Sequence, residues 1–361
     1  MARCPHCPRR ENPMQLDDAI RIARAALPHF GLDDAAPIAF VKYRENHVFR
    51  ADDPAGPVAV RLHRPGYRDD DEVRTELEYL RALRAAGVPV PDVLTTTGGA
   101  PFVRLGHGET ERLVSVQRWI RDAAPFGDIA PALSGEHDPE PEEFAAIGRL
   151  LGRLHAAGDV IGRPAAFRRG SWDAAGLAGP DPLWGDPSAL ASLTADEREI
   201  IADGARGLFA RLRILASSAA DYGIVHADAT PENLLVTAGG LALIDFDDFG
   251  LGWFVFDLVT AIFHHARNPR YPDYERAIIE GYRSERPLSA VSLAAWDDFM
   301  LARGLTYLGW AAERPGDPAS DFISAVVAPW VVEIADAART DRPAPWRVPT
   351  STRQTAWTET V

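Results

Sequence analysis

The sequence predicts an α+β protein in which a β-rich N-terminal part precedes a longer, mostly helical part. Three short strand-like runs, separated by turn residues, lie between residues 37 and 63. From residue 141 onward, much of the chain carries apolar residues at the three- and four-residue spacing of helices. Within that helical part, residues 223–257 form a compact strand–turn–strand pattern that is rich in acidic residues.

The composition is that of a globular protein and argues against nucleic-acid-binding and membrane-spanning classes. The chain has 361 residues, is 46% hydrophobic and 25% charged, and has a net charge of −14, which is an ordinary globular composition. Such an acidic protein is not expected to bind nucleic acid. No apolar run approaches the roughly 20 residues needed to span a bilayer, and no secretory signal pattern precedes the basic start of the chain. A cytoplasmic protein without a membrane partner is expected.

The only two cysteines, Cys4 and Cys7, lie near the N-terminus. A Cys-x-x-Cys pair supplies half of a zinc site, and the sequence has no second cysteine pair to complete it. We therefore interpret residues 1–15 as a flexible tail. The last residues, 346–361, are expected to form a second tail.

The elements expected in the N-terminal part follow from the apolar spacing. A helix is predicted over residues 16–30, and strands over residues 38–43, 47–52 and 57–63. A helix over residues 69–86 begins with four acids and ends at a glycine. Further strands are predicted near residues 93–96, 101–105 and 112–119.

The C-terminal part is expected to be mainly helical. Proline, glycine and acidic residues between 122 and 140 indicate a surface loop. The predicted helices cover residues 141–157, 194–221, 253–264, 273–283, 289–314 and 317–340. Isolated tryptophans between 162 and 186 indicate a loop that either lines a binding site or is anchored to the core.

The strand–turn–strand pattern places three polar side chains together. A short strand ending at Val225 leads to Asp228, and Asn233 follows five residues later. Two strands joined by a glycine turn at residues 239–240 then lead to Asp245, so all three side chains are expected at one end of a small sheet. An aspartate beside an acceptor hydroxyl can orient it, while asparagine and aspartate supply oxygen ligands for Mg²⁺.

The motif His-x-Asp-x-x-Pro-Glu-Asn, followed by a hairpin and Ile-Asp-Phe-Asp, resembles the protein-kinase catalytic loop and metal site. It is most similar to the family of aminoglycoside phosphotransferases, choline kinases and type II homoserine kinases, over residues 36–310. The resemblance implies a two-lobed protein-kinase-like fold with an antiparallel-sheet N-lobe and a mostly helical C-lobe. It also implies transfer of the γ-phosphate of ATP, with Mg²⁺, to a hydroxyl group of a small molecule.

The resemblance also implies roles for individual residues. Asp228 would orient the hydroxyl, Asn233 and Asp245 would bind Mg²⁺, and Asp247 would bind a second Mg²⁺ or orient the first. The implied domains are an N-lobe over residues 16–116, a hinge over residues 117–121 and a C-lobe over residues 122–345. His155, His226 and Asp257 are expected to be structural.

Two further residues are expected to contact phosphate. The loop between the first two strands has no glycine, and Asn46 resembles the asparagine that many family members carry at its tip. Arg61 occupies the third-strand position where kinases place a lysine, and arginine keeps the charge while adding a planar, bidentate fork.

Glu76 is predicted to be the partner of Arg61. The buried stripe of the helix over residues 69–86 contains Val73, Leu80 and Leu83, and Glu76 points with that stripe whereas Glu78 does not. A carboxylate on the core side requires a cation. We therefore predict an ion pair between Glu76 and Arg61.

Adenine is expected to contact the hinge mainly through backbone groups, with Gln117 and Trp119 bracketing the contacts. The acceptor pocket has no diagnostic motif. The residues expected in its wall are Trp172, Trp184, Asp247, Asp248 and Trp310.

Two alternatives remain open from the sequence. A bacterial Ser/Thr protein kinase would usually carry lysine two residues after the catalytic aspartate, where this chain has Thr230, and an Ala-Pro-Glu segment, which it lacks. A catalytically impaired nucleotide-binding pseudokinase is suggested by Arg61 and by the missing glycines. The absence of a nucleophile elbow and of a Walker-type loop excludes acyl transfer and P-loop chemistry.

Overall fold

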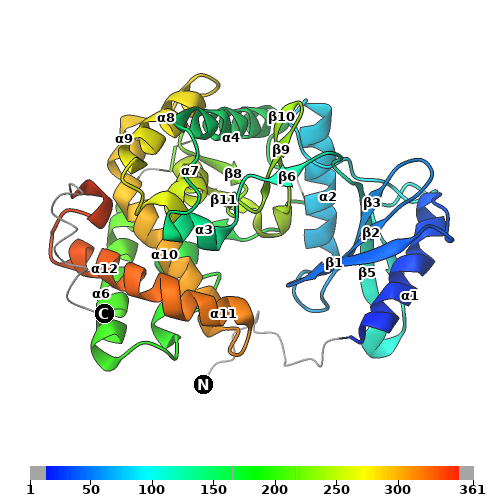
Figure 1. The fold of residues 1–361 in the computed structure, drawn as a ribbon, viewed down its shortest axis with the longest axis horizontal. Coiled ribbons are helices and arrows are strands. Elements are labelled where there is room, and N and C mark those ends of the chain that lie inside the picture. The colour runs from blue at the N-terminus through cyan, green and yellow to red at the C-terminus, as the bar shows by residue number, and fades with distance from the viewer. Residues whose placement is uncertain (1–13, 165, 216, 219, 349–361) are drawn as a thin grey trace. The chain divides into compact units, whose positions relative to one another are not determined.

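A computed structural model describes residues 14–164, 166–215, 217–218 and 220–348, and it divides into two compact units (Figure 1). The first, which we call the sheet unit, comprises residues 1–124, 161–169 and 237–247. The second, the helical unit, comprises residues 125–160, 170–236 and 248–361. Most of both predicted tails, with Cys4 and Cys7, lies outside the described residues. No helix in the described part of the chain has the length and apolarity needed to cross a bilayer.

The sheet unit is built on a five-stranded antiparallel sheet with the strand order β1-β2-β3-β5-β4. The strands are β1 (Ile38–Tyr43), β2 (His47–Ala51), β3 (Val58–Leu62), β4 (Val103–Leu105) and β5 (Arg112–Arg118). Helix α1 (Leu16–Ala26) covers one face, where its alanines and Ile22 pack against the alternate apolar residues of the strands. Only an isolated bridge at Val93 represents the strand predicted near residues 93–96.

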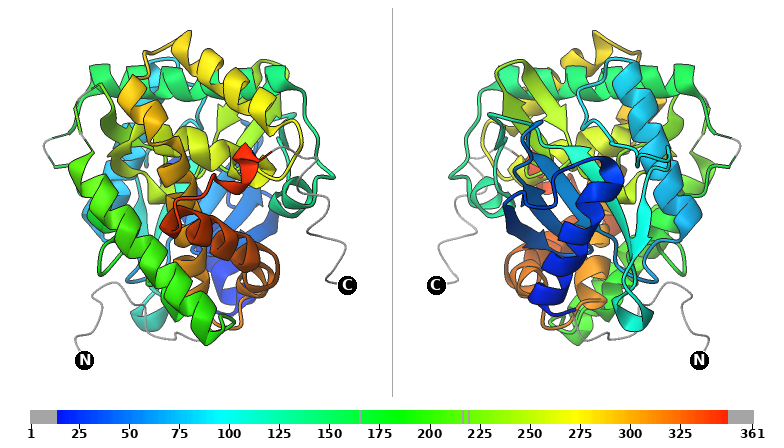
Figure 2. Two further views of the ribbon diagram at one scale, coloured as in Figure 1. Left: turned by 90° about the vertical axis from the view of Figure 1, so that its left-hand side faces the viewer. Right: turned by 90° about the vertical axis from the view of Figure 1, so that its right-hand side faces the viewer.

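Helix α2 (Asp70–Ala85) lies on the side of the sheet opposite α1 (Figures 1 and 2). It begins where the acid cluster predicted, with Asp69 and Glu72 forming a reciprocal capping box. It ends before Gly87, whose φ of 83° is the left-handed conformation that glycine tolerates. The buried face includes Val73, Leu77 and Leu80.

The helical unit contains most of the remaining elements. Its helices are α3 (Ile129–Ser134), α4 (Pro141–Ile161), α5 (Ala174–Ala178), α6 (Ala195–Ile214), α7 (Phe254–Ile262), α8 (Tyr271–Arg283), α9 (Ala290–Ala294), α10 (Trp296–Ala312), α11 (Pro318–Phe322) and α12 (Ala328–Arg339). A small sheet has the order β7-β11-β8, from β7 (Ser171–Trp172), β8 (Tyr222–Val225) and β11 (Gly250–Trp253). Every residue of α7 is buried, and α10 packs against it.

The predicted hairpin consists of β9 (Leu234–Thr237) and β10 (Gly240–Leu243), which belong to a sheet with β6 (Ala124–Pro125). The division between the two units falls inside β9. Asn233 therefore belongs to the helical unit, and Asp245 belongs to the sheet unit.

Three predicted helices end early or are interrupted in the structure, and the helix predicted over residues 141–157 extends to Ile161. The helix predicted over residues 194–221 ends at Ile214, and further along the chain the Ser218 hydroxyl donates to the Asp221 carboxylate while its carbonyl accepts the Asp221 backbone N–H. The helix predicted over residues 289–314 is divided at Ala295 into α9 and α10. The helix predicted over residues 317–340 contains a π-helical segment, Ile323–Val327.

Candidate active site

The loop that carries Asp228 is held by a buried carboxylate. Strand β8 ends at Val225, and the next two backbone N–H groups, of His226 and Ala227, each donate to Asp257 at 2.7 Å. Ala227 has a φ of 67°, a conformation that is uncommon for a residue with a side chain. The two hydrogen bonds stabilise this bend, which confirms the predicted structural role of Asp257.

Asp257 also accepts a hydrogen bond from His155 Nε2 at 3.0 Å, and both side chains are fully buried. Burial alone would raise the pKa of Asp257, but the hydrogen bond and charge of His155 and the His226 backbone N–H together hold this pKa below its usual value. The other ring nitrogen of His155 lies 3.0 Å from the Tyr282 hydroxyl. The expected structural role of His155 is therefore confirmed.

His226 supports the loop through its own side chain as well. The ring is buried, and its Nδ1 accepts the backbone N–H of Asp228 at 3.2 Å. This contact fixes the position of the Asp228 backbone, so the predicted structural role of His226 is confirmed.

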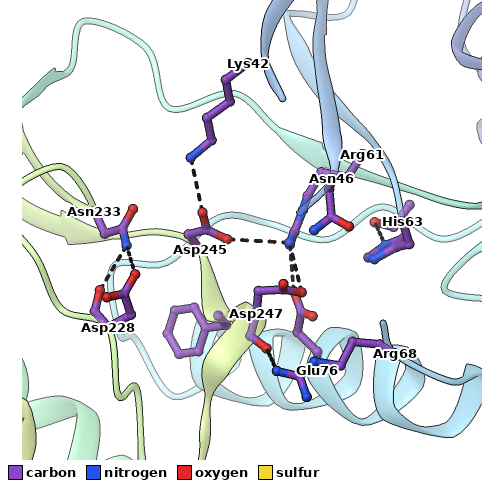
Figure 3. A network of polar contacts seen from close by, with 12 residues as sticks. Lys42, Asn46, Arg61, His63, Arg68, Glu76, Asp228, Asn233, Asp245 and Asp247 are labelled. Carbon is purple, nitrogen blue, oxygen red and sulfur yellow. Dashed lines mark hydrogen bonds and ion pairs between the residues drawn. The ribbon is translucent and has the colours of Figure 1, made fainter. Parts of the chain in front are cut away.

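Asp228 and Asn233 lie in contact in the helical unit (Figure 3). The Asn233 amide nitrogen donates at 2.9 Å both to the Asp228 backbone carbonyl and to its Oδ2. This orientation turns the amide oxygen of Asn233 away from Asp228. The Asp228 side chain keeps an exposed fraction of 25%, so a ligand can reach the carboxylate.

The second oxygen of Asp228 contacts a residue that the sequence analysis missed. Arg303, on α10, donates from Nη2 to Asp228 Oδ1 at 2.8 Å and to the Tyr307 hydroxyl at 2.9 Å. Its side chain is only 1% exposed, and its guanidinium also lies over the Trp184 ring. Burial alone would lower the pKa of Arg303, but Tyr307 and Asp228 outweigh it and raise this pKa.

The tryptophans of the 162–186 region are tied to the end of the predicted metal segment. The Trp172 indole donates to the Asp248 carbonyl at 2.8 Å, and the Trp184 indole donates to the Asp248 carboxylate at 3.3 Å. Trp172 is buried, and its ring packs edge-on against that of Trp184. Whether these residues and Trp310 line an acceptor pocket stays a prediction.

In the sheet unit, the predicted ion pair between Arg61 and Glu76 is confirmed. The guanidinium Nη1 lies 2.6 Å from Glu76 Oε1, and the two side chains are 7% and 0% exposed (Figure 3). Burial alone would lower the pKa of Arg61, but the charges of Glu76, Asp245 and Asp247 outweigh it and raise this pKa above its usual value. Arg61 therefore remains a fixed positive charge.

Asp245 and Asp247 lie beside the same guanidinium. Arg61 Nη2 is 3.5 Å from an oxygen of each carboxylate. Asp245 has a φ of 66°, and the Asp247 backbone carbonyl accepts hydrogen bonds from Arg68 and Arg169. Neither carboxylate oxygen of Asp247, although buried, accepts a hydrogen bond from the described residues. Buried carboxylate oxygens in this state suit a divalent cation.

No cluster of three or more His, Cys, Asp or Glu side chains suited to a metal ion occurs in the described ranges. The metal site predicted from the sequence also includes Asn233, whose ligand atom would be an amide oxygen.

The remaining predicted contacts also lie in the sheet unit. Asn46 is buried and its side-chain oxygen accepts the Arg64 backbone N–H at 3.1 Å, which ties the loop after β1 to the end of β3. Gln117 is buried, and its Nε2 has no hydrogen-bond partner among the described residues. Trp119 lies beneath the Arg50 guanidinium, at 5.4 Å. Contacts of these residues with nucleotide remain predictions.

Comparison with known proteins identifies the family. The profile of the phosphotransferase enzyme family, APH, matches residues 39–290. An amicoumacin kinase of Bacillus subtilis (strain 168) is 24% identical over 75% of this chain and 79% of its own. A protein of Salmonella typhimurium named Serine/threonine protein kinase RdoA is 24% identical over 76% and 77% of the two chains.

A solved structure extends the similarity to nearly the full length. It is described as a microcompartment-associated aminopropanol kinase, is 28% identical, and covers 89% of this chain and 98% of its own with a TM-score of 0.78. The antiparallel-sheet N-terminal region and helical remainder are thus those of protein-kinase-like phosphotransferases, as predicted. The chain belongs to the phosphotransferase enzyme family and is an enzyme that transfers phosphoryl groups to hydroxyl acceptors.

Proposed function

We propose that the protein is an ATP- and Mg²⁺-dependent kinase that phosphorylates a hydroxyl group of a small molecule. The observation that carries the proposal is the state of Asp228, a partly exposed carboxylate fixed by Asn233 on one oxygen and Arg303 on the other. Phosphoryl transfer depends chiefly on positioning and on charge stabilisation, so a carboxylate held in one orientation is the group that the reaction requires.

Asp228 would act on the acceptor. An alcohol that donates a hydrogen bond to its accessible carboxylate would be oriented for attack, and the carboxylate would take the proton as the new bond forms. The hydrogen bonds that Asp257 accepts from the loop backbone hold this geometry before the substrate arrives. The expected consequence is that little reorganisation is needed at the moment of reaction.

Arg61 would bind the nucleotide phosphates, positioned by Glu76 and kept charged by its surrounding carboxylates. We propose Asn46 as a further phosphate contact, and Gln117 and Trp119 as neighbours of adenine in a hinge over residues 117–121. The lobe boundaries in this proposal are residues 16–116 and 122–345.

Asn233, Asp245 and Asp247 are the proposed Mg²⁺ ligands. Their oxygens are the hard ligands that this ion prefers, and the buried Asp247 oxygens without hydrogen bonds fit that use. When bound, the ion would neutralise charge on the phosphates. A relative of this fold, amicoumacin kinase hAmiN, was solved with AMP-PNP and Ca²⁺, which supports nucleotide and divalent-metal use in this chain.

An amino alcohol is the first acceptor class to test, because the structural similarity to the aminopropanol kinase covers 89% of this chain and 98% of that kinase. A protein acceptor is the second candidate, because the Salmonella relative is named as a protein kinase. Thr230, at the position where protein kinases carry a lysine, disfavours the second candidate.

Mg²⁺-dependent ATP consumption, measured over a panel of amino alcohols, homoserine, sugars and aminoglycosides, tests the proposal. We expect at least one acceptor to stimulate turnover, and we expect chelation of Mg²⁺ to remove the activity. Asp228→Ala should abolish transfer and still bind ATP. Transfer to proteins in an extract but to no small molecule would favour the second candidate, and full activity of Asp228→Ala would refute the assignment.

A further inference from the structure

We propose that Lys42, on β1, is a second phosphate-binding cation of this enzyme, which acts beside Arg61. The inference rests on the proposed use of ATP, but it concerns a residue that neither the sequence motif nor the similarity to other proteins identified. Lys42, Arg61, Glu76 and Asp245 all belong to the sheet unit.

A β-bulge determines the direction in which Lys42 points. In the register of β1 and β2, Phe40 is opposite Phe49, but Lys42, rather than Val41, is opposite Val48. Val41 is therefore the extra residue, and the alternation of the strand is shifted by one from this point onward. Without the bulge, Lys42 would share the face of Phe40, whose ring packs against the core residue Phe49.

The bulge places Lys42 on the face that carries Arg61. Val48 of β2 is opposite both Lys42 on β1 and Arg61 on β3, and directly opposed residues of antiparallel strands project to the same side. Lys42 and Arg61 are thus two strands apart in one row, with their backbones separated by roughly 10 Å. Long side chains from these positions can converge on one ligand.

Both side chains do converge, on a single carboxylate. Lys42 Nζ is 3.2 Å from Asp245 Oδ2, and Arg61 Nη2 is 3.5 Å from Asp245 Oδ1 (Figure 3). Arg61 is nearly buried and is held by Glu76, whereas the Lys42 side chain is 43% exposed. Lys42 can therefore change partners at little cost, since an exposed ion pair is weak.

The proposed exchange follows from charge. A magnesium ion held by Asp245 would replace the cation that Lys42 now provides to that carboxylate, and the ammonium would then face the phosphate oxygens of the same nucleotide. Lysine binds phosphate as a compact point charge on a flexible stem, which complements the rigid fork of Arg61. Lys42 on β1 would thus supply the lysine ammonium that kinases place on the third strand, where this chain has Arg61.

If Lys42 only neutralises Asp245, its removal is expected to change Mg–ATP affinity in the opposite direction from the loss of a phosphate contact. If Lys42 served only to balance Asp245, its removal would free the carboxylate for Mg²⁺ and would leave Mg–ATP binding unchanged or tighter. A phosphate contact predicts weaker binding of ATP, with no change for adenosine, which has no phosphate. The direction of the change therefore separates the two roles.

Equilibrium binding of Mg–ATP and of adenosine to the full chain, by titration calorimetry, is the test. We expect Lys42→Met to weaken Mg–ATP about tenfold or more and to leave adenosine unchanged, because a charge-assisted hydrogen bond is lost. Lys42→Arg should restore most of the affinity. The double variant Val41→Lys with Lys42→Val keeps the charge but moves it to the bulged position, so it should behave like Lys42→Met.

Arg104→Met is the matched control, because Arg104 is an exposed cation on β4 of the same sheet that pairs with Asp70 and Glu111. It should leave both affinities unchanged. The proposed role of Lys42 would be overturned if Lys42→Met weakened Mg–ATP binding less than fivefold, tightened it, or weakened adenosine binding equally. The proposed function would not be affected by these outcomes. Failure of the unsubstituted protein to bind ATP would instead overturn the proposed function as well.

Discussion

Each unit of the protein contains a buried arginine that holds a carboxylate, and the two differ in what remains accessible. Arg61 lies 2.6 Å from Glu76, and Arg303 lies 2.8 Å from Asp228. Both arginines are almost fully buried, yet Glu76 is 0% exposed and the Asp228 side chain is 25% exposed. Glu76 holds the side chain of Arg61 in place. Arg303, in contrast, holds the carboxylate of Asp228 in place and leaves it accessible to a ligand.

The comparison separates two uses of one interaction. A buried ion pair contributes little net stability, because desolvation of the charges offsets their attraction, but removing one partner leaves the other charge buried and uncompensated. In the sheet unit this rigidity fixes the direction of the arginine. In the helical unit it fixes the direction of the aspartate. Substitutions of the four residues should therefore fall into two distinct groups.

The largest expected effect is on catalysis, from Asp228→Ala. We expect kcat to fall by about a thousandfold or more, because the acceptor hydroxyl loses the group that orients it and takes its proton. ATP affinity should stay within about threefold, since Asp228 is not a proposed phosphate contact. Steady-state kinetics and calorimetric ATP binding measure the two quantities. If ATP affinity fell as much as kcat, Asp228 would not differ from Arg61 in its role, and the contrast between the Asp228–Arg303 and Glu76–Arg61 pairs would be refuted.

Glu76→Ala should have the largest effect on stability. Arg61 would keep the more distant carboxylates of Asp245 and Asp247, 3.5 Å away, so we expect a loss of about 3 kcal/mol in the free energy of unfolding. ATP binding should weaken as well, because Arg61 would lose its fixed direction. Urea denaturation followed by tryptophan fluorescence measures the first effect.

Glu78→Ala is the matched control for Glu76→Ala. Glu78 lies on the same helix, its side chain is 55% exposed, and it forms an ion pair with Arg74 at 4.0 Å. Such a surface pair contributes at most about 1 kcal/mol. Equal destabilisation by the two substitutions would show that the helix, and not the buried ion pair, determines the response.

Arg303→Met should produce an intermediate effect on catalysis. Asp228 would keep its hydrogen bond to Asn233 but lose the contact on Oδ1, so we expect kcat to fall by about 10- to 100-fold with ATP affinity unchanged. Arg303→Lys should recover part of the loss by restoring the charge. Arg211→Met, which removes an arginine paired with Asp298 on the surface of α10, should leave kcat unchanged. A weaker ATP affinity with unchanged kcat would refute a role for Arg303 in positioning Asp228.

The sequence predicted the Glu76 pair and missed the Arg303 pair, although the same argument applies to both. Glu76 was found because a carboxylate on an apolar helix stripe requires a cation. Arg303 lies in an equally apolar segment, Trp296–Ala312, but no motif drew attention to it. A search for any buried charge in an apolar helix would have found it. Its partner Asp228 is 75 positions away, and sequence spacing alone cannot reveal that contact.

The strands of the N-terminal sheet and the two ends of α2 were predictable because alternation and end signals are local, whereas the pairing of β3 with β5 is not a local signal. The bulge at Val41 was not, because it changes the direction of Lys42 without changing any apolar residue. The break at Ala295 and the π-helical segment Ile323–Val327 were missed as well, because they too are irregularities of the backbone. Long-range pairing and backbone irregularity are thus the parts that required the structure.

The smallest expected effects concern two histidines, one beside each arginine. His63 and His264 are buried, and burial together with Arg61 and Arg303, respectively, holds the pKa of each well below its usual value. His63 faces Ser115, and His264 faces Tyr307 and the neighbouring His265. In the folded protein both rings therefore remain neutral in mildly acidic solution.

The sign of the pH dependence follows from proton uptake. In the unfolded chain a histidine takes up a proton below about pH 6.5, so the unfolded state binds more protons than the folded state and stability falls as the pH decreases. Each histidine should contribute about 1.4 kcal/mol to the loss between pH 7.5 and pH 5.5. His63→Gln and His264→Gln, compared with the unsubstituted protein by urea denaturation at both pH values, should each reduce the loss by that amount. If only one variant reduced the loss, the proposed lowering of the pKa would be refuted for the other histidine. The contrast between the two ion pairs would still stand.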